Sequence, residues 1–253
     1  MMTVTGVETI APISRAEARA LATTEYARLV DQLRSLAADD WARPTDCSLW
    51  DVRDVAGHSV GMLSDFTSFR TLIRRLRAAT SAAKVSGGPT IDAMTAMQVA
   101  DNAGLSIEEL IARAERNGPR AARWRTTAPG LFRMVPMTEE VGGRAETWRM
   151  GYLLDTILTR DPWMHRIDIA RATGRALVLT PAHDGRIVAD VVAEWSRRHG
   201  QPCTLVLTGP AGGRFVAGNG TVGEQLTIDA VEFCRTLSGR AEGTGLLAQQ
   251  VPF

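Results

Sequence analysis

The residues whose types and spacing could bind a metal ion lie in two separate segments of the chain. Asp161 and His165 are four positions apart, so in a helix their side chains would project from one face, one turn apart. A carboxylate oxygen and an imidazole nitrogen at that spacing can hold one divalent cation at about 2.0–2.2 Å each. Catalytic zinc sites commonly have three protein ligands and an open position, and His58 on a neighbouring helix would complete the set. The pattern predicts a metal site of His58, Asp161 and His165.

Two of these residues also have structural explanations. His58 lies at the edge of the apolar stripe of its predicted helix, where a histidine hydrogen-bonded to a carboxylate is the alternative. Pro162 disfavours helical backbone at the residue before it and suits the first position of a helix, so the alternative for Asp161 is a helix N-cap. Ligation and capping are compatible if each uses a different carboxylate oxygen. From the residues alone, both roles stay open for Asp161.

Four helical regions are predicted to position these residues. Apolar residues recur at helical spacing in 14–38, 51–77, 90–124 (interrupted near Gly104) and 147–172. Ser14 and Glu17 form a capping box at the start of the first region, and Asp51 caps the second. Three cations are expected at the end of the second region, where they suit the helix dipole: Arg74, Arg75 and Arg77. Four helices with apolar faces predict a four-helix bundle.

After Gly174 the pattern changes from long helices to short strands. The predicted elements are a helix at 184–199 and strands at 203–208, 214–217 and 224–228. Asp229 with Glu232 caps a final helix that ends at Gly239. The stretch 126–143 is weakly periodic and is predicted to be a long connection. The predicted division is a flexible leader at 1–13, a metal-binding four-helix bundle at 14–174 and a smaller α+β domain at 175–253.

Composition excludes several classes of protein. The chain is 45% hydrophobic and 23% charged, as is typical of soluble globular proteins. A net charge of +1 offers no basic surface for a nucleic-acid partner. No apolar run approaches the length of a membrane span, and the first residues lack the features of a signal peptide, so no membrane partner is expected. The widely spaced Cys47, Cys203 and Cys234 show no disulfide framework and fit a reducing cytoplasm.

Two stretches around the candidate ligands carry a family resemblance. They read Trp41-x-x-Pro44-Thr45-x-Cys47-x-x-Trp50-x-Val52-Arg53-Asp54-Val55-x-x-His58 and Arg160-Asp161-x-Trp163-Met164-His165-Arg166-x-Asp168-x-Ala170-Arg171-Ala172-x-Gly174. Both resemble the N-terminal domain of the mycothiol-dependent maleylpyruvate isomerases, which belongs to the DinB-like metal-binding bundles. The stretch from Leu226 to Arg240 resembles the C-terminal domain found beside it, which is related to sterol-carrier-type folds. The resemblance implies an all-α DinB-like bundle followed by a sterol-carrier-like α+β domain.

The resemblance also implies a chemistry for the candidate ligands. The family's histidine on the second helix falls on His58, and its closing Glu-x-x-x-His falls on Asp161 and His165, with Asp in place of Glu. A divalent metal, zinc or similar, is implied there, with mycothiol as the thiol cosubstrate. Metal coordination stabilises a thiolate, which would attack a small electrophilic substrate in an isomerase or S-transferase reaction. Lys84 is the only lysine among the 29 basic residues, which indicates a GC-rich genome and suits an actinobacterial source.

Further candidates lie outside this group. A dicarboxylate substrate would need cationic partners, and the planar fork of arginine suits carboxylates. Arg235 and Arg240 are therefore candidate substrate-binding residues, with surface arginines near a helix end as the alternative. Three aspartates are candidates for orienting the histidines: Asp54, Asp65 and Asp168. The alternative function is a non-catalytic protein that binds a metal and a small ligand.

Overall fold

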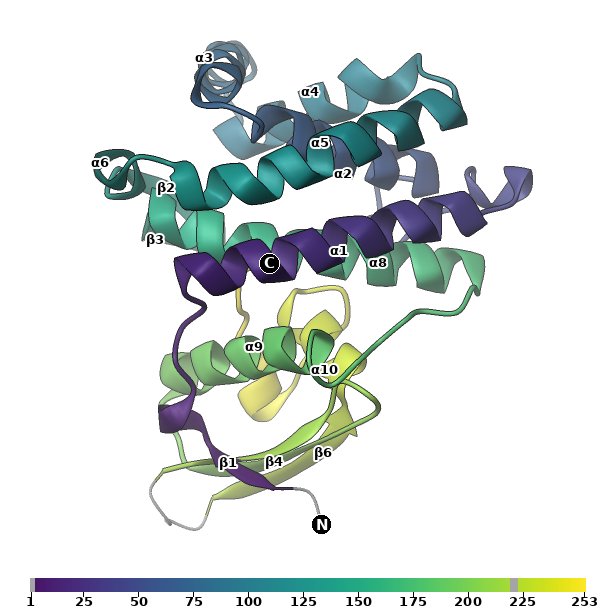
Figure 1. Ribbon diagram of the computed structural model, residues 1–253. Helices are drawn as coiled ribbons and strands as arrows, with labels where there is room; N and C mark the ends of the chain where they lie inside the picture. Colours follow the sequence, from purple (N-terminus) through teal and green to yellow (C-terminus); the bar gives the residue numbers. More distant parts are fainter. Residues whose placement is uncertain (1–2, 219–222) are drawn as a thin grey trace. The chain divides into compact units, whose positions relative to one another are not determined.

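The computed structural model describes residues 3–218 and 223–253 and divides the chain into two compact units. The helical unit contains Arg15–Arg133 and Asp161–Leu177, and the sheet unit contains Met1–Ser14, Met134–Arg160 and Val178–Phe253. The expected class, a mostly helical N-terminal region with a smaller C-terminal sheet region, is confirmed (Figure 1). The predicted domain limits at 13, 174 and 175 stay predictions.

The helical unit is built from helices that pack in pairs. Its elements are α1 (Arg15–Ser35), η2 (Ala38–Asp40), α2 (Val52–Asp65), α3 (Phe69–Ser86), α4 (Thr90–Ala103), α5 (Ile107–Thr127), α6 (Gly130–Arg133) and the part of α8 (Leu158–Thr173) from Asp161 onward. α1 packs on α5, α2 packs on α4 and α5, and α3 packs mainly on α4. Buried Arg166 of α8 pairs with Glu25 of α1 at 2.5 Å. Among the described helices, none is both long enough and apolar enough to cross a lipid bilayer.

The region predicted as one helix over 51–77 is two helices. α2 ends at Asp65, and Ser68 starts α3 by accepting a hydrogen bond from the Thr71 backbone N–H. The three arginines predicted at a helix end therefore lie in the first half of α3, where the dipole does not favour cations. Arg75 is held instead by Asp65, whose carboxylate accepts a hydrogen bond from its Nε at 2.9 Å. The error arises because the apolar stripe continues at helical spacing across a break of three residues, 66–68.

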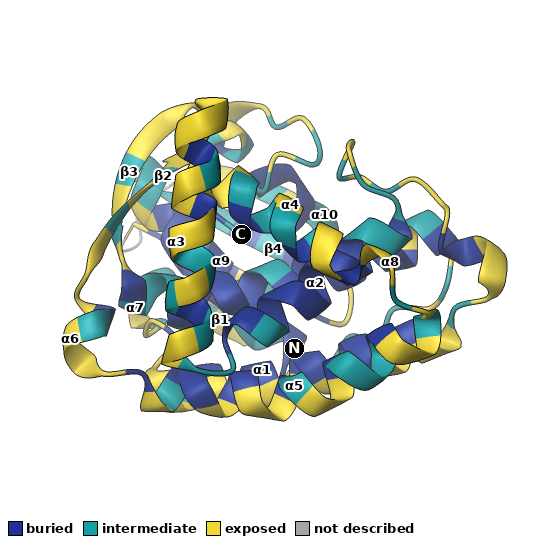
Figure 2. Ribbon diagram, turned by 90° about the horizontal axis from the view of Figure 1, so that it is seen from above, coloured by how far each residue is buried: buried dark blue, intermediate teal, exposed yellow. Residues whose placement is uncertain are grey.

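The helix that carries His58 is buried on nearly all sides and is dark blue in Figure 2. Gly57 and Gly61 are four positions apart and lie on one face of α2, against which α4 packs closely. A Cβ atom at Gly61 would lie only 2.8 Å from the Cα of Gln98, so this approach requires glycine. Because successive residues are about 100° apart around a helix, His58 projects to one side of the face that the two glycines present to α4.

Replacing Gly61 by alanine is expected to lower the free energy of unfolding by about 1–3 kcal/mol, because the new methyl group would overlap α4 at Gln98. Gly57→Ala is the matched control, since its Cβ would meet its nearest neighbour at an ordinary 3.6 Å. Alanine also favours a helix over glycine by about 1 kcal/mol. Urea denaturation of the two variants measures the difference. Equal stabilities would contradict the close packing of α2 on α4.

The sheet unit contains a four-stranded sheet with two helices on one side (Figure 1). The strand order is β1 (Val4–Gly6), β5 (Gly213–Ala217), β4 (Cys203–Thr208) and β6 (Glu224–Asp229). β4 runs antiparallel to β5 and parallel to β6. The helices are α9 (Asp184–His199) and α10 (Ala230–Leu237), and between them the rings of Trp195 and Phe233 meet edge-on with centroids 5.3 Å apart. The unit also contains two short turns of 3-10 helix, η1 (Val7–Thr9) and η4 (Gly245–Ala248), and the elements of Met134–Arg160.

The elements predicted between residues 184 and 237 are confirmed by α9, β4, β5, β6 and α10. Asp229 caps α10, accepting hydrogen bonds from the backbone N–H groups of Val231 and Glu232 at 2.8 and 3.3 Å. β1 lies within the segment predicted as a flexible leader and pairs parallel with β5. A strand of three residues is too short for alternation along the sequence to reveal it.

The stretch predicted as a long connection, 126–143, contains part of a hairpin. β2 (Pro136–Val141) pairs antiparallel with β3 (Arg144–Arg149), and Gly142 and Gly143, with φ of 57° and 76°, form the two-residue turn. The prediction of a helix from residue 147 is therefore wrong at its start. Helical backbone begins after β3 with α7 (Met150–Tyr152) and the π-helical η3 (Leu153–Ile157), which lead into α8. The Gly-Gly pair between alternating residues was the available signal.

Candidate metal centre

The helical unit brings His58, Asp161 and His165 together. His58 comes from the middle of α2, while Asp161 and His165 lie one turn apart in α8. Nε2 of His165 is 3.3 Å from Oδ1 of Asp161, and Nε2 of His58 is 3.6 Å from Oδ2 of the same carboxylate. One potential ligand atom from each residue lies within 4.8 Å of the other two. Two imidazoles and one carboxylate thus lie close together, and their role as metal ligands stays a prediction.

Two polar atoms of this group are buried without a hydrogen-bond partner in the described part of the chain. They are Oδ2 of Asp161 and Nδ1 of His58. The 3.6 Å contact between Asp161 and His58 is too long for a hydrogen bond. Leaving a buried carboxylate oxygen unpaired costs free energy that a cation between the three side chains would recover. Two imidazole nitrogens and a carboxylate oxygen form a donor set that zinc takes in proteins, so the residues fit a divalent ion.

Asp161 lies inside α8 and not at its start. The helix begins at Leu158, so the alternative that Asp161 is an N-cap is wrong. The π-helical turn of η3 runs directly into α8, and the helical backbone is already established when the chain reaches Pro162. Burial opposes ionisation of Asp161, but the charge of His165 and the contact with His58 outweigh it and lower the Asp161 pKa far below its usual range. The group therefore carries the negative charge that a metal ligand needs.

His165 is oriented by a buried carboxylate. Its Nδ1 lies 3.0 Å from Oδ2 of Asp168, which is fully buried, and the thiol of Cys47 donates to the same oxygen at 3.5 Å. Burial opposes protonation of His165, but Asp161 and Asp168 outweigh it and raise the His165 pKa. If a metal ion displaces the Nε2 proton, the carboxylate at Nδ1 would keep the remaining proton there and leave the Nε2 lone pair for the ion. Of the three aspartates predicted to orient a histidine, Asp168 makes this contact. Asp65 accepts hydrogen bonds from Arg75 and Gln98 instead.

Trp50 forms a wall of the candidate centre and was missed as a functional residue in the sequence. Its indole ring lies 4.9 Å from the His58 ring, tilted by 32°, and 6.2 Å from the His165 ring. The rings of the two histidines are themselves 5.0 Å apart, edge to face. The available signal was the presence of Trp50 in the motif that leads to His58.

The predicted substrate-binding arginines, Arg235 and Arg240, belong to the sheet unit. Arg235 is 5% exposed, and its guanidinium donates to Oε2 of Glu232 at 2.6 Å and to the carbonyl of Arg240 at 3.5 Å. These contacts tie the end of α10 to the residues that follow it. The role of both arginines in substrate binding stays a prediction.

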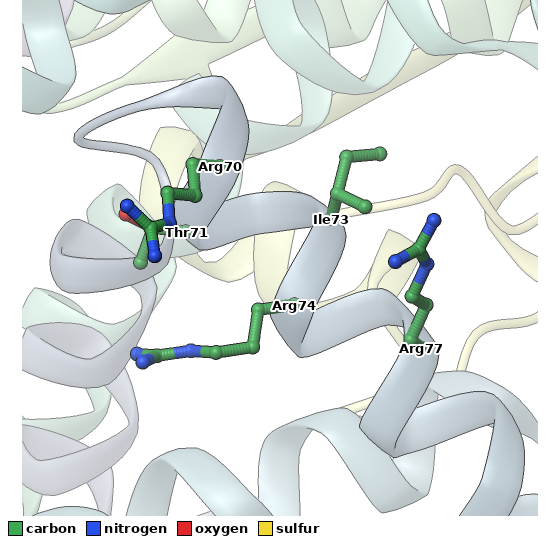
Figure 3. Close-up of a pocket in the computed structure, with 5 residues that line it drawn as sticks. All are labelled: Arg70, Thr71, Ile73, Arg74 and Arg77. Atoms are coloured by element: carbon green, nitrogen blue, oxygen red, sulfur yellow. The ribbon is translucent and has the colours of Figure 1, made fainter.

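A pocket of about 440 Å³ lies along α3 and is lined by Arg70, Thr71, Ile73, Arg74 and Arg77 (Figure 3). The side chains of Arg70 and Arg74 project to the same side of the helix. None of the lining residues belongs to the group around His58, so this pocket is separate from the candidate metal centre.

The fold and the convergent side chains define a two-unit protein with a candidate metal centre in its helical unit. Residues 22–170 match the model of a known family, the mycothiol maleylpyruvate isomerase N-terminal domain. This match covers more than half of the chain, and the protein therefore belongs to that family.

Two solved structures share the fold. They are crystal structures of the mycothiol-dependent maleylpyruvate isomerase and of a histidine-to-alanine mutant of it, each 15% identical to this chain with a TM-score of 0.53. Each comparison covers 94% of this chain and 92% of the other. At this identity the likeness describes the fold alone. No curated protein matches the sequence.

Proposed function

We propose that this protein is a thiol-dependent metalloenzyme of the maleylpyruvate isomerase type. In this proposal it uses mycothiol as cosubstrate and acts on a small electrophilic substrate as an isomerase or S-transferase. The observation that carries the proposal is the convergence of His58, Asp161 and His165 around an unpaired, buried carboxylate oxygen in a member of this family. A DinB-like bundle, a sterol-carrier-like second domain and a cytoplasmic location are part of the same proposal.

The residues of the site would divide the work between them. His58 and His165 bind as neutral donors and Asp161 contributes one negative charge, so a divalent ion would keep a net positive charge. Such an ion supplies the electrostatic stabilisation that converts a thiol to its nucleophilic thiolate. Asp168 holds the proton of His165 on Nδ1 and so keeps Nε2 free for ligation. Three protein ligands leave a coordination position for the thiol sulfur, and zinc is the proposed metal.

Metal analysis followed by a thiol-dependent assay tests this proposal. Elemental analysis of the purified protein is expected to find one divalent ion per chain. Titration of the zinc-loaded protein with mycothiol is expected to show saturable binding, and conversion of maleylpyruvate is expected to require that thiol. Glutathione is the control for thiol identity. A folded, metal-loaded protein that neither binds mycothiol nor turns over maleylpyruvate would contradict the enzyme and favour a non-catalytic metal-binding protein.

A further inference from the structure

The two candidate histidine ligands are held in different ways. His165 is fixed by a hydrogen bond from Nδ1 to the Asp168 carboxylate at 3.0 Å. His58 has no such partner in the described residues, since its buried Nδ1 lacks any hydrogen bond. Metal-binding histidines usually donate this second N–H to a carboxylate, carbonyl or water, which sets the direction of the ring. No hydrogen bond to the described residues therefore sets the direction of the His58 imidazole.

Trp50 is the residue that contacts the ring of His58 over its face. The two ring centroids are 4.9 Å apart with an interplanar angle of 32°, which is a tilted stack. Such a contact restricts rotation of the imidazole about its χ2 angle, because a rotated ring would collide with the larger indole. The His165 ring meets His58 edge to face at 5.0 Å and provides a second aromatic contact. Together the two contacts restrict the rotation of the His58 ring.

The loop that carries Trp50 is itself held rigidly. The backbone N–H of Trp50 donates to the carbonyl of Cys47 at 2.8 Å, and the Trp50 carbonyl accepts from the Thr45 hydroxyl at 2.8 Å. Pro44 and Asp51 form an isolated antiparallel bridge at the two ends of the loop. Asp51 then caps α2, accepting from a backbone N–H of its first turn at 2.9 Å. A closed loop anchored to the start of α2 keeps the indole at a set distance from His58, two turns further along.

We infer that Trp50 is a positioning residue of the proposed metal centre, which orients His58 by ring packing in place of a hydrogen-bonding partner. The loop 44–51 then serves both histidines, because Cys47 also donates to the carboxylate that orients His165. This inference rests on the proposed metal site. It assigns different supports to the two ligands: a carboxylate behind His165 and an indole against His58.

The test compares metal affinity in Trp50→Leu, Trp50→Phe and the wild type, by competition for zinc with a chromophoric chelator. Trp50→Leu is expected to bind zinc about 10–100-fold more weakly, the loss that follows removal of a group that orients a ligand. Trp50→Phe keeps a flat ring and is expected to lie between the two. The visible absorption of the cobalt-loaded proteins reports the coordination geometry and is expected to change in Trp50→Leu.

Trp124→Leu is the control for a merely structural effect. Trp124 is a buried tryptophan of the same unit whose ring packs on Phe66 and Phe132. Its replacement is expected to lower the unfolding free energy while the affinity for zinc stays within about twofold of wild type. If Trp50→Leu and Trp124→Leu change affinity and stability in parallel, Trp50 has no positioning role.

A double-mutant cycle identifies the ligand through which Trp50 acts. In a His58→Ala background, Trp50→Leu is expected to leave the residual zinc affinity unchanged, because the ring that it orients is gone. In an Asp168→Asn background, Trp50→Leu is expected to lower the zinc affinity by the same factor as in the wild type, because Trp50 and Asp168 support different ligands. A wild type that binds no zinc would refute the metal site itself. Equal zinc affinities in the wild type and in Trp50→Leu would refute only the role of Trp50.

Discussion

The His165→Ala variant is expected to lose specific zinc binding. His165 supplies one of three convergent donor atoms, and its ring is held in place by the carboxylate of Asp168. The expected loss of zinc affinity exceeds the roughly 10–100-fold loss that follows removal of a group that orients a ligand, because here the ligand itself is removed. His58→Ala is expected to lower the zinc affinity by more than about 100-fold but to keep weak residual binding through Asp161 and His165, which lie one turn apart in α8. Chelator competition and elemental analysis after dialysis measure both.

Thermal or urea unfolding gives an independent readout of the same loss. A ligand that binds only the folded state stabilises it by about 2.7 kcal/mol at a free concentration of 100 times Kd. The wild type is therefore expected to gain about this much at saturating zinc, while His165→Ala gains nothing at the same concentration. His199→Ala is the control, since His199 lies in the sheet unit and outside the ligand group. A full zinc effect in His165→Ala would contradict the site.

Asp161→Asn separates ligation from a structural role for the carboxylate. Asparagine keeps the size of the side chain but removes the negative charge, which the site needs for a cation. Because Asp161 lies inside α8 and does not cap it, the variant is expected to lose zinc while α8 keeps its stability. Retained zinc with a weakened helix would instead return Asp161 to a structural role.

The Arg160→Met variant is expected to lose about 3–5 kcal/mol of unfolding free energy, the usual effect of removing one partner from a buried ion pair. Arg160 is fully buried, and its Nη2 lies 2.6 Å from Oδ2 of Asp190 and 2.8 Å from Oε2 of Glu194. Its Nη1 donates to the carbonyl of Pro252 at 3.0 Å. Without the guanidinium, two buried carboxylates of α9 and this carbonyl each lose one partner. Urea unfolding at pH 7 measures the change.

The pH dependence of this loss follows from the Glu194 carboxyl. Burial raises its pKa, but Arg160 and the hydrogen bonds from Tyr152 and Arg198 outweigh burial and lower it below 4.5. A carboxyl group whose pKa is lower in the folded state than in the unfolded state stabilises the fold at pH values above the unfolded-state pKa. This stabilisation is lost as the pH falls through the folded-state pKa. The difference between wild type and Arg160→Met is therefore expected to shrink below pH 4.5. The double variant Arg160→Met/Glu194→Gln is expected to recover part of the unfolding free energy that Arg160→Met loses. A loss of less than about 0.5 kcal/mol in Arg160→Met would contradict the network.

The sequence by itself determined the features that depend on neighbours along the chain. Asp161 and His165 are predicted as a pair because a helix places residues four apart on one face. Asp229 is predicted as a cap because its carboxylate bonds backbone groups two and three residues ahead. The helices and strands from 184 to 237 are predicted because apolar residues recur with a helical period in some segments and alternate in others. A few residues are enough to show which of the two patterns a segment has. Each of these signals is local.

The tertiary structure alone decided which distant residues share a site. It joined His58 to a pair more than a hundred residues away, turned both oxygens of Asp161 toward imidazoles, and placed Trp50 against the ring of His58. It also placed β1 beside β5, at the far end of the chain. Such contacts arise from the packing of buried faces, which sequence spacing does not encode. The candidate metal site was therefore only partly recognisable as a local sequence motif, and the arrangement of its three side chains came from the packing that brings α2 and α8 together.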